Sequence, residues 1–143
     1  MKFSYRELEV ISSPASPKRR TVFRPIIPIF LVSSPRIVGY EALIDSGADY
    51  NVFDAGVASI LGIPLTKGNK RQIIGLGGQK VKGYEHAVTL KVGPHKYKTK
   101  VLFSKEIPPN SFGVLGTVGF FDHFSVLLSY KRKIIEVKHT TPD

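Results

Sequence analysis

Turn-forming residues divide this sequence into many short segments, and that division limits the folds that the chain can adopt. Prolines and glycines, 10 and 13 in number, recur between apolar runs that are mostly of strand length. The segment 54–62 instead has apolar residues at helical spacing, with Asp54 as a candidate N-cap and Gly62 as a stop. One further helical turn fits residues 118–124. Strand-like patterns are predicted over residues 2–10, 21–33, 36–44, 96–103, 113–116, 125–130 and 133–138, and residues 71–92 are predicted to form two strand-like arms around a glycine-rich tip. This pattern indicates an all-β chain with one or two short helices, either a closed barrel or a sandwich.

Two features refine this expectation. Pro25 and Pro28 lack the N–H groups that a central strand uses, so the run over residues 21–33 should be bent or lie at a sheet edge. Residues 11–20 are rich in Ser, Pro and basic side chains and are predicted to form an exposed connector. A length of 143 residues suits one core, so we expect a single domain over residues 1–143.

Composition removes several classes of protein. The chain has no cysteine, which excludes disulfides and thiolate metal sites. The longest apolar run, residues 26–32, is too short to span a membrane, and residues 1–10 lack the apolar core of a secretory signal, so a cytoplasmic location is expected. The net charge of +10 suits an anionic partner, but the basic residues are spread along the chain, with a short cluster at 18–20. Nucleic acid is therefore an unlikely partner.

The segment ALIDSGADYNVF, residues 42–53, contains the candidate chemistry, because Asp45 follows an apolar run and precedes Ser-Gly-Ala. A serine nucleophile would need a positioned His and Asp, and the nucleophile elbow G-x-S-x-G is missing. The histidines have no metal-ligand spacing. The glycine-rich residues 73–80 lack the G-K-[ST] of a phosphate loop, so no metal and no cofactor are expected.

A catalytic aspartate is a better interpretation. A carboxylate at a strand end beside a glycine suits the floor of a cleft. Activation of water by aspartates needs two carboxylates, one acting as base and the other as acid. The chain has one such segment, and a twofold dimer would supply the second carboxylate.

Three motifs in order resemble the retroviral-type, or retropepsin-like, aspartic proteases, whose members include single-domain bacterial proteins. ALIDSGADYNVF resembles the block A-L-[IL]-D-[ST]-G-A-[DN]-x-[ST]-V. QIIGLGGQKVKGY, at residues 72–84, resembles the flap, and GVLGTVGFF, at residues 113–121, resembles the hydrophobic-hydrophobic-Gly element. The resemblance implies an acid-protease-type β-barrel with a flap hairpin that acts as a homodimer on an extended peptide or protein substrate.

The resemblance also assigns roles to residues. Asp45 would be the catalytic acid, Ser46 would brace the two active-site loops of a dimer, and Asp49 would bind the substrate main chain. The active-site loop would be supported by Ser46, Gly47, Val114, Leu115 and Gly116. Substrate would be bound by Gly47, Ala48, Asp49, Ile74, Gly75, Leu76, Gly77 and Gly78.

The sequence departs from the family at two positions. Thr117 stands where many members have an arginine that pairs with the counterpart of Asp49, and Asn51 stands where a serine or threonine is common. The leading hypothesis is an aspartic endopeptidase. The alternative is a catalytically silent retropepsin fold that serves as a dimerisation or peptide-binding module.

Overall fold

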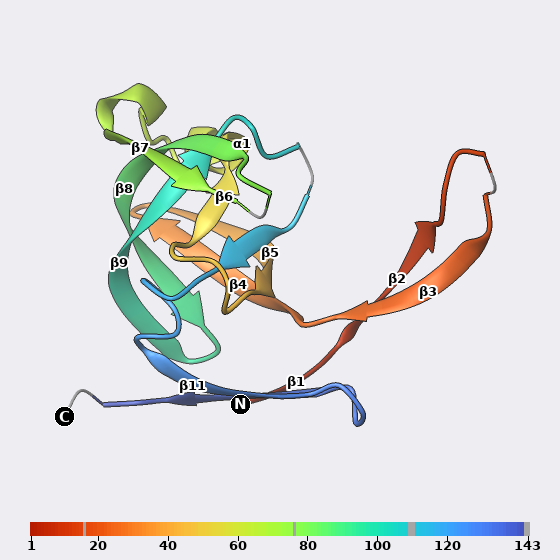
Figure 1. The fold of residues 1–143 in the computed structure, drawn as a ribbon. Helices are drawn as coiled ribbons and strands as arrows, with labels where there is room; N and C mark the ends of the chain where they lie inside the picture. The colour runs from red at the N-terminus through yellow and green to blue at the C-terminus, as the bar shows by residue number, and fades with distance from the viewer. Residues whose placement is uncertain (16, 76, 109–110, 142–143) are drawn as a thin grey trace.

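Six strands form a closed ring in the computed structural model, which describes residues 1–15, 17–75, 77–108 and 111–141. The ring is closed because β8 pairs with both β9 and β4, the latter through Phe30–Lys91 and its neighbours. This arrangement confirms the predicted closed barrel (Figure 1). In order around the ring, the strands are β4 (Ile26–Ser33), β5 (Arg36–Ile44), β10 (Gly113–Leu115), β6 (Val52–Asp54), β9 (His95–Ser104) and β8 (Lys80–Val92).

The long strand β8 has two partners along the same side. Its first residues pair with β7 (Asn69–Ile74), and its later residues pair with β4. The strands β7 and β8 therefore form a hairpin that extends beyond the ring, with the glycine-rich segment at its turn. The two strand-like arms predicted around that segment are confirmed.

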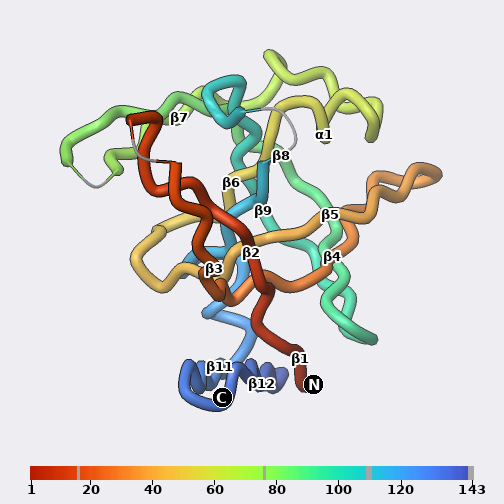
Figure 2. Tube along the Cα trace, turned by 90° about the vertical axis from the view of Figure 1, so that its right-hand side faces the viewer, coloured from red at the N-terminus to blue at the C-terminus, as the bar shows by residue number. Residues whose placement is uncertain are grey.

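Both ends of the chain meet in a second, smaller sheet. It contains β1 (Lys2–Ser4), β12 (Ile134–His139) and β11 (Phe124–Ser129) in that order. Figure 2 shows β1 beside β11 and β12. The terminal strands thus pair with each other within one chain, with Phe3 opposite Ile135.

A two-stranded arm leaves the body of the protein between these sheets (Figure 1). It consists of β2 (Arg6–Ile11) and β3 (Arg19–Arg24), which pair with each other and with no other strand in the described ranges. The connector predicted over residues 11–20 is shorter than expected, because Ile11 belongs to β2 and Arg19 and Arg20 belong to β3. The strand expected over residues 2–10 is divided at Tyr5 into β1 and β2.

Pro25 and Pro28 lie where the missing proline N–H breaks no strand pairing. The strand expected over residues 21–33 is interrupted at Pro25, between β3 and β4. Pro28 lies within β4 opposite Glu41 of β5, at a position that β8 does not reach. Its missing N–H therefore removes no bond from the ring, although β4 as a whole is not an edge strand.

The core fills the ring and continues toward the terminal sheet. Alternate residues of β4, β8 and β9 point inward, and rings of Phe53, Phe103 and Phe120 fill the centre. The helix α1 (Ala55–Ile60) covers one end and buries Val57. A short 3-10 helix, η1 (Leu65–Lys67), follows it.

The predicted ends of α1 are confirmed. The Asp54 carboxylate accepts a hydrogen bond from the Gly56 N–H at 3.1 Å, which satisfies one of the free donors of the first turn. Gly62 ends the segment with φ of +71°, a conformation that glycine adopts without steric cost. No helix in the described part of the chain has the length and apolar character needed to cross a bilayer.

Candidate active site

Asp45 lies where β5 ends, beside the short strand β10. The two strands run parallel, with Leu115 opposite Ile44. The Asp45 N–H donates to the Leu115 carbonyl oxygen at 3.0 Å, which extends the ladder by one bond. The backbone of Asp45 is thus held by the sheet, while its side chain contacts the loop that follows.

The loop after Asp45 is a tight turn built on that residue. The Asp45 carbonyl accepts a hydrogen bond from the Ala48 N–H at 3.1 Å. Its carboxylate oxygen Oδ1 accepts a second bond from the Gly47 N–H at 2.9 Å. One carboxylate oxygen is therefore occupied by the turn, and this bond orients the carboxyl group. Ser46 is exposed and its side chain makes no hydrogen bond within the described residues.

A second loop, residues 116–119, closes against the first. The chain leaves β5, passes over the end of β10 and enters β6 on the other side. Beyond β10, the N–H and hydroxyl groups of Thr117 both donate to the Ala48 carbonyl, at 2.8 and 3.2 Å. The Val118 N–H donates to the Asp49 carbonyl at 2.9 Å. Thr117 therefore joins the two loops, although it stands where the family often has arginine.

Close packing of the two loops requires glycine at position 116. A Cβ atom there would lie 2.6 Å from the carbonyl oxygens of both Ala48 and Tyr50. Real Cβ atoms essentially never approach so closely. Gly116 is also fully within the interior, so its lack of a side chain lets the two loops touch.

Asn51 joins this site, and no role was predicted for it. Its side chain is completely buried, and its Oδ1 accepts a hydrogen bond from the Gly116 N–H at 2.9 Å. The available signal was a polar residue directly before the apolar pair Val52 and Phe53. Buried polar side chains are normally hydrogen-bonded to something specific, so an asparagine in an apolar run marks a structural contact.

A cavity of about 590 Å³ lies between the loop that follows Asp45 and the hairpin of β7 and β8. The loop contributes Asp45, and the hairpin contributes the apolar Ile73 and Val81, which face each other across β7 and β8. Among the residues that the structure describes, twelve line the cavity: Asp45, Gly47, Ala48, Asp49, Tyr50, Val52, Ile73, Ile74, Gly75, Val81, Ile107 and Val114.

Most of the residues singled out in the sequence meet at this cavity. Among those that do not line it, Leu115 and Gly116 lie behind the loop as buried support. Gly77 and Gly78 lie at the hairpin turn, where both have positive φ, +86° and +79°. The Gly78 N–H donates to the Gly75 carbonyl at 3.1 Å. Leu76 lies outside the described residues.

The charged groups of the cavity are carboxylates without basic partners. Neither Asp45 nor Asp49 forms an ion pair with another described residue. Within the ranges that the structure describes, no cluster of three or more His, Cys, Asp or Glu side chains has a geometry that would hold a metal ion. The chemistry that this site offers is that of an accessible carboxylate facing an apolar hairpin.

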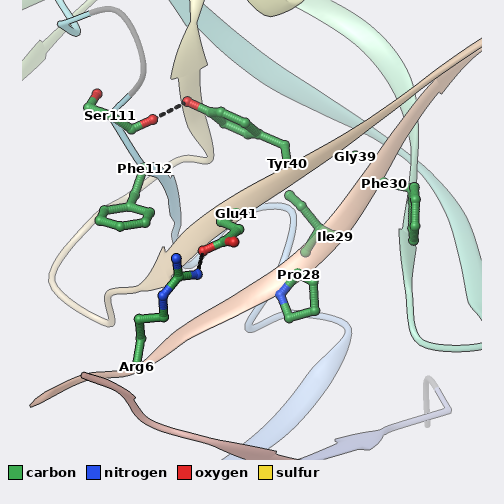
Figure 3. Close-up of a pocket in the computed structure, with 9 residues that line it drawn as sticks. All are labelled: Arg6, Pro28, Ile29, Phe30, Gly39, Tyr40, Glu41, Ser111 and Phe112. Carbon is green, nitrogen blue, oxygen red and sulfur yellow. Dashed lines mark hydrogen bonds and ion pairs between the residues drawn. The ribbon is translucent and has the colours of Figure 1, made fainter. Parts of the chain in front are cut away.

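A second cavity, of about 600 Å³, lies on the outer wall of the barrel beside β4 and β5 (Figure 3). Its one carboxylate, Glu41, forms an ion pair with Arg6 of the arm, and Tyr40 donates its hydroxyl hydrogen to the Ser111 carbonyl at 2.9 Å. None of the predicted site residues lines it. The ion pair connects the arm to the barrel wall.

Comparison with known proteins gives matches at the level of family and of fold. A family model described as aspartyl protease matches residues 38–117, which include Asp45 and the loop that follows it, the hairpin of β7 and β8, and β10. No curated protein matches the sequence.

Solved structures include two informative neighbours. A retropepsin-like aspartic protease from Rickettsia conorii is 15% identical, with a TM-score of 0.57, and the match covers 96% of this chain and 92% of that one. The EIAV protease in complex with the inhibitor HBY-793 is 28% identical, covering 65% of this chain and 81% of that one. Its TM-score is 0.48, so the shared fold is established by the bacterial structure.

The family match covers more than half of the chain, and the three motifs that suggested a protease all lie within or beside it. The sequence resemblance, the closed barrel and the family match agree. This chain belongs to the aspartyl protease family and has the fold of a retropepsin-like aspartic endopeptidase.

Proposed function

We propose that two copies of this chain form one endopeptidase site, in which the two Asp45 carboxylates activate a water molecule. The observation that supports this proposal is the position of Asp45 at a cavity that residues of the β7–β8 hairpin also line. One carboxylate must accept a proton from water while the other donates one to the substrate. Each chain contributes one Asp45, so a twofold arrangement supplies the pair.

The surface around the active-site loop supports a dimer. Ile74, at the end of a flap strand, is 74% exposed, and Val118, beside the active-site loop, is 46% exposed. Tyr50, which pairs with Val118, is also exposed. Clustered exposed apolar side chains are typical of protein interfaces. The exposed Ser46 hydroxyl is available to a partner's loop, in line with its proposed bracing role.

In the proposed mechanism, a peptide enters in an extended conformation between the active-site loop and the flap. The free edges and carbonyl groups of these segments would pair with the substrate backbone as an added strand does. The water held between the carboxylates loses a proton to one of them and attacks the peptide carbonyl. The other carboxyl group donates its proton, and the leaving nitrogen departs as an amine.

The flap would exclude bulk water from the reaction, and the glycines at its turn allow the conformational change that closing requires. The apolar lining from Ile73, Val81 and Val114 favours apolar substrate side chains beside the cleaved bond. Asp49, at the cavity wall without an ion pair in the described chain, is free to accept hydrogen bonds from substrate N–H groups.

The direct test is cleavage of a mixed peptide library between pH 4 and 7 by the wild type and by Asp45→Asn. We expect cleavage by the wild type, strongest on the acidic side because a shared proton is needed, and none by the variant. Glu9→Gln is a suitable control, since it removes the same charge from the exposed arm. Full activity of Asp45→Asn would refute the mechanism.

Mixing the two proteins tests whether the site is shared. If each site needs an Asp45 from both chains, an equal amount of Asp45→Asn should reduce wild-type activity to about half after subunit exchange. A site within one chain would keep its full activity. A dimer in sedimentation that binds peptides but never cleaves them, whether or not Asp45 is replaced, would instead favour the silent binding module.

A further inference from the structure

One peptide group, between Leu115 and Gly116, links Asn51 to Asp45. Its carbonyl oxygen accepts the Asp45 N–H at 3.0 Å, and its N–H donates to Asn51 Oδ1 at 2.9 Å. A peptide group is planar and rigid, so fixing its N–H also fixes the direction of its carbonyl. We infer that Asn51 is a positioning residue that holds the backbone of Asp45 in place through this peptide group. The inference rests on the proposed catalytic role of Asp45.

Asn51 is itself fixed to the barrel and can therefore fix the position of the Leu115–Gly116 peptide group. Its own carbonyl accepts a hydrogen bond from the Leu102 N–H of β9 at 2.9 Å, so its backbone is tied to the barrel wall. Its side chain is completely buried, and hydrogen bonds are electrostatically stronger away from water. The chain of bonds therefore runs from the barrel, through Asn51 and the Leu115–Gly116 peptide group, to Asp45.

The amide nitrogen of Asn51, Nδ2, shows which side-chain atom explains the presence of an asparagine. Its Nδ2 is buried and has no hydrogen-bond partner among the described residues. A Cβ atom on Gly119 would lie 2.5 Å from Nδ2, so glycine at that position makes room for the amide. An unpaired buried donor lowers stability, and an apolar side chain of the same size would avoid that loss. The amide is therefore explained by its oxygen, the side-chain atom that makes a bond.

Two substitutions at position 51 separate the oxygen from the rest of the side chain. Asn51→Leu keeps the approximate size and removes the acceptor. Asn51→Asp keeps an oxygen in the same place, and at acidic pH the buried carboxyl group stays neutral because burial disfavours the charged form. Since Nδ2 makes no bond in the described chain, the aspartic acid loses nothing there. Leu90→Ala serves as a control, because it removes core volume from the barrel wall.

Two measurements follow at about pH 4.5. Amide hydrogen exchange reports directly on the Gly116 and Asp45 N–H groups. Asn51→Leu should expose both N–H groups to exchange. In Asn51→Asp and Leu90→Ala, both N–H groups should stay as well protected as the overall stability of each variant allows. In peptide cleavage, Asn51→Leu should lower kcat about 100-fold, since small misplacements of reacting groups have effects of that size, with a far smaller change in KM. Asn51→Asp should restore kcat.

The results with the Asn51 variants either support or refute the positioning role of Asn51. A folded Asn51→Leu variant with both amides protected and kcat unchanged would overturn the inference. If that variant does not fold, Asn51→Asp decides alone: kcat and protection near the wild-type values support the role of the oxygen, and a 100-fold loss of kcat in a folded protein refutes it. If the wild type cleaves nothing, the proposed function fails, and amide exchange still tests whether Asn51 holds Asp45.

Discussion

Replacing Gly116 by alanine should damage both stability and the proposed activity, because this residue lets the loop after Asp45 and the loop at residues 116–119 touch. The added Cβ would lie 2.6 Å from the carbonyl oxygens of Ala48 and Tyr50. Both oxygens belong to backbone, and the Ala48 carbonyl already accepts two hydrogen bonds from Thr117. No flexible side chain can move aside, so the loops themselves must separate.

The size of the effect follows from the distances. Ordinary van der Waals contact for a Cβ atom begins at 3.4 Å, and the added Cβ would lie 2.6 Å from each carbonyl oxygen. The two loops would therefore have to move apart by about 0.8 Å, the difference between these distances. Overpacking of a tight interior costs about 1–3 kcal/mol of unfolding free energy. A shift approaching 1 Å in the loop that carries Asp45 should also reduce kcat about 100-fold.

The assay combines urea unfolding with peptide cleavage, and Gly39→Ala is the matched control. A Cβ at Gly39 would first meet the partly exposed ring of Phe30 at 3.4 Å, an ordinary contact with a side chain that can move. We expect this control to keep its stability and activity. If Gly116→Ala were as stable and as active as the wild type, the close approach of the loops would have no importance, and our account of the site would be refuted.

Three other predictions concern the scaffold. Lys91 and Lys96 lie opposite each other on β8 and β9, and neither forms an ion pair with a described carboxylate. Because facing like charges destabilise a sheet, Lys96→Glu should raise the free energy of unfolding by about 0.2–1 kcal/mol in low salt. A free energy of unfolding below that of the wild type would contradict this prediction. Burial, aided by the charge of Asp122, raises the pKa of Tyr97 well above its ordinary value of 10. Its protonated form is thus favoured in the folded state, so stability should be unaffected by this group below pH 10 and fall as the pH rises above 10. Tyr97→Phe should remove that part of the fall in alkaline unfolding curves, and an unchanged pH dependence would count against it. Asp54→Ala should cost about 0.5–2 kcal/mol through loss of the α1 N-cap, measurable by thermal unfolding, whereas an unchanged melting temperature would show that the cap is dispensable.

Local patterns in the sequence predicted the elements well where the physical signal is local. Alternating apolar residues predicted most strands, and the glycine-rich segment predicted the hairpin of β7 and β8. Asp54 and Gly62 predicted the ends of α1, because capping and left-handed turns depend on residues close in the chain. The expectation of one strand over residues 2–10 was wrong in detail, since the interruption at Tyr5 depends on which sheet each half joins.

Three motifs in order, at residues 42–53, 72–84 and 113–121, were together sufficient to predict the family. They did not reveal how the loop after Asp45 is held. Thr117 and Ala48 are 69 positions apart, and the Gly116 bond to Asn51 spans 65 positions. Contacts of this range have no signature in spacing or periodicity.

The amino-acid sequence by itself determined the strands, their turns and the one carboxylate that suits catalysis, since these depend on neighbouring residues and on elementary backbone chemistry. The tertiary structure alone decided that β10 lies between β5 and β6, and that Asn51 reaches the peptide group next to Asp45. Those facts arise from the closure of the ring, which brings distant segments together through hydrogen bonds and burial that each segment lacks on its own.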